Sequence, residues 1–292
     1  MINKLNDIYY RIRIIKLFTV LIIPRRPMAK TTLDKWNPEF LSQSPVFKTI
    51  EQAALYHTHS DQWPSLEQLK QQFKKSEHPI IPVTQGAKPT KLEDHYEPRI
   101  YLKHELQTRT ENWHDFFNAM IWLTFRNTKL ILNKLHYHAA IERPPGTNRS
   151  QLENAITLFD ECGIIIISDK EALLEMIRQH QWKELFVDNK DSFNKHIYCY
   201  VFGHAMYEKS LAPYIGMTCQ ALLINSTELI NSCHNNRLND IDNMVSDYWS
   251  NHKITSTDDL NPFPLLGIPS LHKENSKASF YDNTDYFRPL RK

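Results

Sequence analysis

The sequence predicts a mixed α and β (α+β) fold, a helix-rich single domain around a small central sheet. Residues 164–167 are four consecutive isoleucines followed by Ser168, a continuous run that is typical of a strand covered on both faces. Helical periodicity with start signals comes before and after this run, at residues 111–123, 150–162 and 170–181. Hydrophobic residues make up 41% and charged residues 23% of the 292 residues, which excludes disordered and collagen-like classes.

The first part of the chain, residues 31–110, predicts helices followed by extended segments. Leu66, Leu69 and Phe73 have helical spacing after Pro64. Residues 80–83 predict a short extended piece. Residues 99–102 predict a strand that leads into the next helix.

The predicted helix at residues 111–123 carries an unusual polar stripe. Glu111, His114, Asp115 and Asn118 lie at i, i+3, i+4 and i+7, opposite a face of aromatic and aliphatic side chains. No lysine or arginine occurs in residues 110–125, although solvent faces usually carry them. Three interpretations remain open: a functional stripe, a buried structural network and an ordinary surface.

A second helix is predicted to start at Ser150 and to end near residue 162. Ser150 and Glu153 have the spacing of a capping box, and Gly163 is expected to end the helix in a left-handed conformation. Asp160 and Glu161 lie in the last turn, where acidic groups oppose the helix dipole. Either a bound cation or a nearby basic side chain would explain this placement.

The loop before this helix carries two arginines, Arg143 and Arg149. Next to a helix N-terminus they are suited to bind an anion, and an ordinary solvated loop is the alternative.

Residues 196–202 predict either a strand or the first half of a long helix, because periodicity does not distinguish the two. After Gly203, His204 and Glu208 have i, i+4 spacing. They could supply two metal ligands, but we favour a hydrogen bond between them.

The end of the chain differs from the rest. Residues 240–249 predict a helix, and the prolines of 261–269 predict extended chain. Residues 280–289 are too aromatic to extend into water. Residues 28–292 are therefore expected to form one globular domain, with residues 261–292 as a tail packed on it.

Residues 1–27 have a net charge of +5, whereas the remainder has −3. We interpret residues 1–27 as a basic extension that is either an over-extended gene start, with Met28 as the natural one, or a loosely attached basic helix, and weak membrane-surface contact is the functional alternative. The acidic remainder makes nucleic-acid binding unexpected. No export signal and no C-x-x-C motif are recognisable, so a cytoplasmic location is expected.

Several motifs have a specific order along the chain. They are RTENWHDFFNA at 109–119, LFDE at 158–161, FGHA at 202–205 with Glu208, PLLGIP at 264–269, FYD at 280–282 and FRP at 287–289. In these motifs the chain resembles an uncharacterised bacterial family, domain of unknown function 3025. The resemblance runs from about residue 36 to the end and implies no reaction, cofactor or catalytic residue.

Two functional hypotheses follow. The first is a non-catalytic module that binds a small anion or a protein partner, with the polar side chains forming a buried network. The alternative is a metal-dependent hydrolase, with a phosphoester as a candidate substrate and zinc, manganese or iron as the ion. The metal ligands would be His114, Asp115, Asp160, His204 and Glu208. Glu111 would act as general base, Asn118 as an orienting group, and Arg143 or Arg149 as an anion clamp.

Other catalytic classes are less well supported. The chain has only 6 glycines and no Gly-rich phosphate-binding motif. It also has no G-x-S-x-G motif and no cysteine with an evident local base, which disfavours nucleophilic serine or cysteine catalysis.

Overall fold

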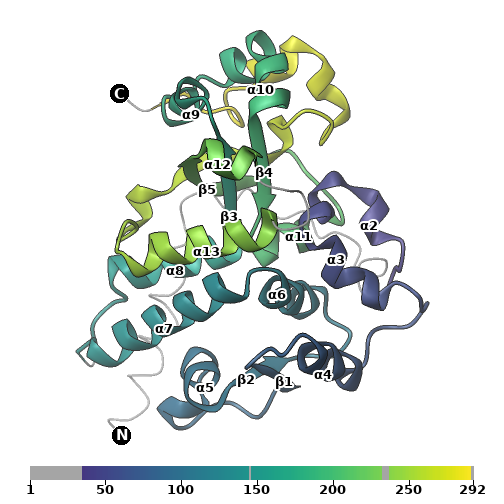
Figure 1. Ribbon diagram of the computed structural model, residues 1–292, viewed down its shortest axis with the longest axis vertical. Helices are drawn as coiled ribbons and strands as arrows, with labels where there is room; N and C mark the ends of the chain where they lie inside the picture. Colours follow the sequence, from purple (N-terminus) through teal and green to yellow (C-terminus); the bar gives the residue numbers. More distant parts are fainter. Residues whose placement is uncertain (1–34, 145, 232–236, 291–292) are drawn as a thin grey trace, which may run out of the picture. The chain divides into compact units, whose positions relative to one another are not determined.

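A four-stranded sheet is built around strand β3 (Gly163–Ser168) in the computed structural model, which describes residues 35–144, 146–231 and 237–290. β3 pairs antiparallel with β4 (Ile197–Val201) and parallel with β5 (Thr218–Asn225), and β5 pairs antiparallel with β6 (Asn261–Pro264). All six residues of β3 are buried, as the isoleucine run predicts. The predicted fold class, helix-rich α+β around a small sheet, is confirmed (Figure 1).

A second sheet has two parallel strands, β1 (Ile81–Thr84) and β2 (Glu105–Thr108), with Ile81 opposite Glu105. It packs against α4 (Leu66–Lys75) and α5 (Tyr96–Lys103). The predicted strand at residues 99–102 is wrong, because these residues belong to α5. Pro98 lies in the first turn of α5, where a missing amide costs no hydrogen bond, and His104 ends the helix in a left-handed conformation with φ 57°.

Helices α6 (Trp113–Thr124) and α7 (Arg126–Glu142) lie between the two sheets in Figure 1. α6 packs against α11 (His204–Ser210), whereas α7 packs against α5, α8 (Gln151–Cys162) and α13 (Arg237–Ser250). α7 therefore joins the small sheet's helix α5 to the helices that pack near the large sheet.

The start of α6 corrects the predicted polar stripe. The Asn112 side chain accepts a hydrogen bond from the Asp115 amide at 3.0 Å, so Asn112 caps the helix and Trp113 is its first residue. Glu111 precedes the helix in a left-handed conformation with φ 53°. Glu111 therefore does not share a helical face with His114.

The predicted capping box of α8 is confirmed, with Ser150 and Glu153 each accepting a hydrogen bond from the other's amide. The predicted left-handed cap at Gly163 is wrong. Gly163 has φ −66° and ψ 146° and opens β3 directly. A Cβ here would lie 2.4 Å from the Phe159 carbonyl oxygen, so glycine is needed for space rather than for a turn.

Of the two structures left open for residues 196–202, the strand is the one that forms: β4 spans Ile197–Val201, whereas His196 ends helix α10 (Lys190–His196). Of the segment predicted to be extended, residues 261–269, the first part forms strand β6, whereas Leu265–Gly267 forms a 3₁₀ turn in which no proline fixes the backbone. Tyr286 and Phe287 are buried, and the Tyr286 hydroxyl donates to the Met217 carbonyl at 2.8 Å while accepting from the Leu266 amide. The tail therefore packs on the strand β5 region through both aromatic and polar contacts.

The remaining elements are short helices and turns. The α-helices are α2 (Phe40–Gln43), α3 (Glu51–Ala54), α9 (Glu171–Arg178), α10 (Lys190–His196) and α12 (Thr227–Asn231). The 3₁₀ turns are η1 (Pro45–Ile50), η2 (Leu55–His57), η3 (Leu92–Asp94), η5 (Thr257–Asp259), η6 (Leu265–Gly267), η7 (Lys273–Ser276) and η8 (Ala278–Asp282), and η4 (Glu184–Asp188) is a π-helical turn.

No helix within the described ranges combines the length and the apolar character that crossing a bilayer requires. The predicted basic extension at residues 1–27, with its alternative of membrane-surface contact, lies outside the described residues.

Candidate functional site

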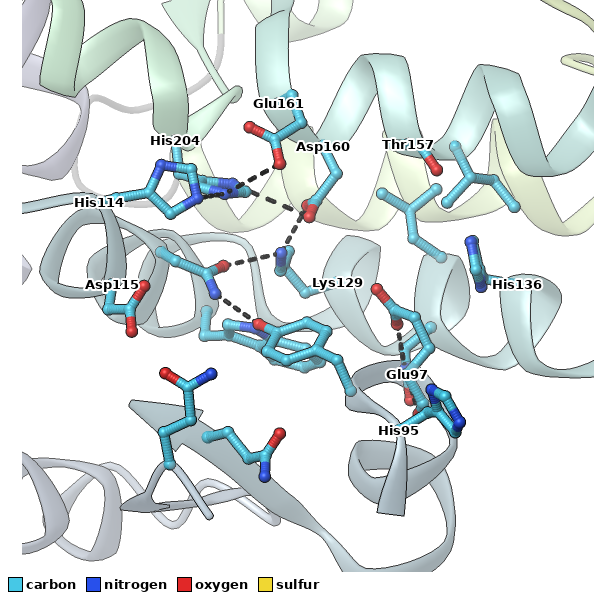
Figure 2. A pocket seen from close by; sticks show the side chains of 18 of the residues that line it. His95, Glu97, His114, Asp115, Lys129, His136, Thr157, Asp160, Glu161 and His204 are labelled. Atoms are coloured by element: carbon cyan, nitrogen blue, oxygen red, sulfur yellow. Dashed lines mark hydrogen bonds and ion pairs between the residues drawn. The ribbon is translucent and has the colours of Figure 1, made fainter. Parts of the chain in front are cut away.

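A polar cavity of about 560 Å³ lies where helices α5, α6, α7, α8 and α11 meet the end of β2 (Figure 2). This volume is within the range of small-molecule sites. Its lining is rich in titratable side chains, among them His95, Glu97, Arg109, His114, Asp115, Lys129, His136, Arg149, Asp160, Glu161 and His204.

Three side chains from three helices converge at one end of this cavity. The Nε2 atoms of His114 in α6 and His204 in α11 are 3.0 Å apart. Glu161, in the last turn of α8, brings its Oε1 to 3.7 Å from His204 Nε2. One ligand atom of each of the three residues lies within 4.8 Å of the others.

The outer nitrogens of both imidazoles lie near carboxylates. His114 Nδ1 is 3.1 Å from Glu208 Oε2, and this hydrogen bond raises the pKa of His114. His204 Nδ1 is 3.8 Å from Asp160 Oδ2, but burial lowers the pKa of His204 to about 3. His204 is therefore a neutral imidazole at neutral pH, as metal binding requires.

The predicted hydrogen bond between His204 and Glu208 does not form. Both residues instead contact His114, which comes from a different helix.

A buried ion pair between Lys129 and Asp160 lies in the middle of the cavity wall. Lys129, with its side chain 4% exposed, donates to Asp160 Oδ1 at 2.5 Å and to Asn118 Oδ1 at 3.0 Å. Asn118 in turn donates to the Tyr96 hydroxyl at 2.6 Å. Burial opposes ionisation of Asp160, yet the Lys129 charge holds its pKa below the usual value. A basic side chain therefore explains why α8 has Asp160 in its last turn.

Glu97 and His136 lie at another end of the cavity. Glu97 Oε2 accepts a hydrogen bond from the Asn133 amide at 2.5 Å. Burial raises the pKa of Glu97. His136 is 9% exposed, and its Nδ1 has no hydrogen-bond partner among the described residues.

Several predicted site residues are engaged elsewhere. Asp115 lines the cavity, but Arg109 binds both of its carboxylate oxygens, at 2.8 and 3.0 Å. Arg143 pairs with the buried Glu153 at 2.7 Å and does not line the cavity, whereas Arg149 does line it, 3.3 Å from the Thr157 hydroxyl.

Glu111 lies outside the cavity and lines a small separate hollow beside Trp63 and Leu66. This position follows from its place before the helix, and it separates Glu111 from the cluster around His114.

Lys129, Asn133 and His136 were not predicted. They lie at i, i+4 and i+7 on α7, the same stripe pattern that identified His114, and could have been found by it. Glu161 was noticed for its unfavourable dipole position but not included among the metal ligands. Glu97 could not be found by helical spacing, because the residues that follow it, 99–102, were predicted as a strand.

The model of the family described as protein of unknown function (DUF3025) matches residues 81–291, which is more than half of the chain. The chain therefore belongs to this family, as the motif resemblance indicated. No curated protein matches the chain, and neither does any solved structure.

Proposed function

We propose that this protein is a metal-dependent hydrolase in which His114, His204 and Glu161 hold a divalent cation. The observation that carries the proposal is the 3.0 Å separation of the two Nε2 atoms, with the Glu161 carboxylate beside them, at the end of a cavity. Two imidazole nitrogens, each ~2.0 to 2.1 Å from a tetrahedral zinc ion, lie ~3.3 Å apart. Shifts of a few tenths of an ångström at the histidines, and somewhat more at Glu161, would bring the donors to ligand positions.

The surroundings of the cluster also suit a metal. Histidine ligands commonly donate their second nitrogen to a carboxylate, and Glu208 is in that position for His114. Two histidines and one glutamate are a donor set found in catalytic zinc sites, which leave a position open, whereas structural sites use four protein ligands. Imidazole-rich sites suit zinc or iron, and manganese less well.

A bound cation of this kind would lower the pKa of a coordinated water and polarise the bond to be hydrolysed. Glu208 would keep the Nε2 lone pair of His114 directed into the cavity, because its own hydrogen bond holds the proton at Nδ1. Asp160 would act as a positioning residue, because it holds Lys129 and lies against His204. Of the arginines and lysines that the structure describes in the cavity lining, Arg149 has no ion pair and would contact an anionic group, since Arg109 and Lys129 are paired with carboxylates.

The test is metal content, measured by inductively coupled plasma mass spectrometry on the untagged full-length protein. We expect near-stoichiometric metal in the wild type and its loss in His114→Ala, His204→Ala and Glu161→Gln. His95→Ala is the matched control, because His95 lines the same cavity without joining the cluster. Circular dichroism checks that each variant is folded. Metal-free wild-type protein that remains metal-free in added zinc, manganese and iron would overturn the proposal.

The second candidate is a non-catalytic binding module. The chain of hydrogen bonds from Asp160 through Lys129 and Asn118 to Tyr96 favours it, because a satisfied polar network can fix helix packing without any reaction. This candidate predicts that His114→Ala lowers the melting temperature and that chelators have no effect on the wild type. A screen of amide and phosphoester substrates on the metal-loaded protein would separate the two candidates further.

A further inference from the structure

The charged groups that line the cavity are unevenly paired. Of its four carboxylates, Asp115 is bound by Arg109 at 2.8 Å and Asp160 by Lys129 at 2.5 Å. Glu161 lies against the two histidines where the cation is proposed. Glu97 is the fourth, and within the described parts of the chain no ion pair to it occurs.

Among the residues that the structure describes, the Glu97 carboxylate accepts a hydrogen bond only from a neutral group, the Asn133 side-chain amide. Lys129 is in the same cavity, but its ammonium already donates to Asp160 and Asn118. Glu97 is half-buried, and the burial of its carboxylate raises its pKa, although the charges of His136 and Lys129 oppose this rise from beyond ion-pair distance. A cation brought by a ligand would remove the rise.

His136 supplies a second acceptor near Glu97. It lies one helical turn beyond Asn133 on α7, and the charge of a protonated His136 would act on Glu97. Its buried Nδ1 has no partner in the described structure, and a neutral imidazole offers one nitrogen lone pair. Figure 2 shows His136 and Glu97 on one side of the cavity and the His114 and His204 rings on the other.

We propose that the Glu97 and His136 end of the cavity binds a primary ammonium group of the substrate. An ammonium group carries three N–H donors, and the Glu97 carboxylate and the His136 imidazole would accept two of them. As a binding site the proposal is independent of the metal. As an assignment of substrate class it rests on the proposed function: the substrate is an amine whose hydrolysable bond reaches the cation held by His114, His204 and Glu161.

The test uses n-butylammonium as probe and 1-butanol as its neutral match, each followed by saturation-transfer NMR at pH 7.5. We expect the wild type to bind n-butylammonium and to bind 1-butanol at least about tenfold more weakly, which is the affinity lost with one hydrogen bond to a charged group. Glu97→Gln keeps the shape of the side chain and should weaken amine binding by a similar factor. Glu93→Gln, which changes an exposed carboxylate four residues away, should leave it unchanged.

Equal signals from the amine and the alcohol on wild-type protein would overturn the proposal without any variant. Equal amine binding by the wild type and Glu97→Gln would overturn it as well, and the comparison of the amine with the alcohol on wild-type protein still decides the question if that variant does not fold. His114→Ala separates this proposal from the metal proposal, because it should lose metal and still bind n-butylammonium.

Discussion

Acid should destabilise this protein through protonation of His78, a histidine that is 8% exposed and does not belong to the cluster of His114, His204 and Glu161. Its Nδ1 accepts a hydrogen bond from the Ile80 amide and its Nε2 donates to the Trp122 carbonyl, each at 3.1 Å. Only the neutral ring can make both bonds, since protonation would place a hydrogen on Nδ1 facing the amide. Burial, with the nearby charge of Arg126, lowers the pKa of His78 from 6.5 to about 4.

The sign of the effect follows from proton uptake. Between pH 6.5 and pH 4 the unfolded chain binds a proton at His78 and the folded protein does not. The free energy of unfolding therefore falls as the pH is lowered through this window. Over the whole window the loss is roughly 3 kcal/mol, and between pH 7.5 and pH 5 it is about 2 kcal/mol.

Urea unfolding at pH 7.5 and pH 5 measures this loss for the wild type and for His78→Gln. The glutamine can still donate to the Trp122 carbonyl but does not titrate, so its pH-dependent loss should be smaller by about 2 kcal/mol. His59→Gln, a change at an exposed histidine, is the control and should follow the wild type. If His78→Gln loses as much stability between the two pH values as the wild type does, the reasoning is refuted.

Two further substitutions test the buried ion pair of the cavity wall and the close approach of Gly203 to the backbone of α8. Lys129→Met should lower the free energy of unfolding at pH 7 by roughly 3 to 5 kcal/mol, because it leaves Asp160 buried without its cation, and adding Asp160→Asn should recover part of the loss. Urea unfolding checks this, and a single variant as stable as the wild type would contradict it. Gly203→Ala should cost about 1 to 3 kcal/mol and lower the melting temperature, because its Cβ would lie 2.5 Å from the Cys162 backbone nitrogen. Gly86→Ala, with nothing closer than 3.9 Å, is the matched control, and equal melting temperatures for the two variants would show that the close approach is relieved without strain.

Local patterns in the sequence were sufficient where the determining interactions are local. The isoleucine run predicted β3 because a strand buried on both faces needs apolar residues at every position. The Ser150 and Glu153 pair predicted the start of α8 because a capping box closes within four residues. Local patterns failed where a short stretch of sequence is compatible with two backbone conformations. Residues 99–102 were predicted as a strand but belong to helix α5, and α6 starts after Asn112 rather than at Glu111.

The candidate site could be predicted only in part. His114 and His204 were recognised as ligand candidates from their helical spacing, each on its own helix. Their meeting, across 90 residues of sequence, depends on the packing of α6 against α11. Glu208 was expected to serve His204 and instead contacts His114, because the helix that carries it faces α6.

The sequence by itself determined the fold class, the strand at the centre of the sheet, the family and most of the side chains of the cluster. Only the tertiary structure decided that Glu161 joins the two histidines and that Lys129 neutralises Asp160 across 31 residues. It also decided that Glu97 forms no ion pair with any described residue. The physical reason is range. Capping and strand burial are set by neighbours along the chain, whereas the pairing of charges in a cavity is set by which helices pack together.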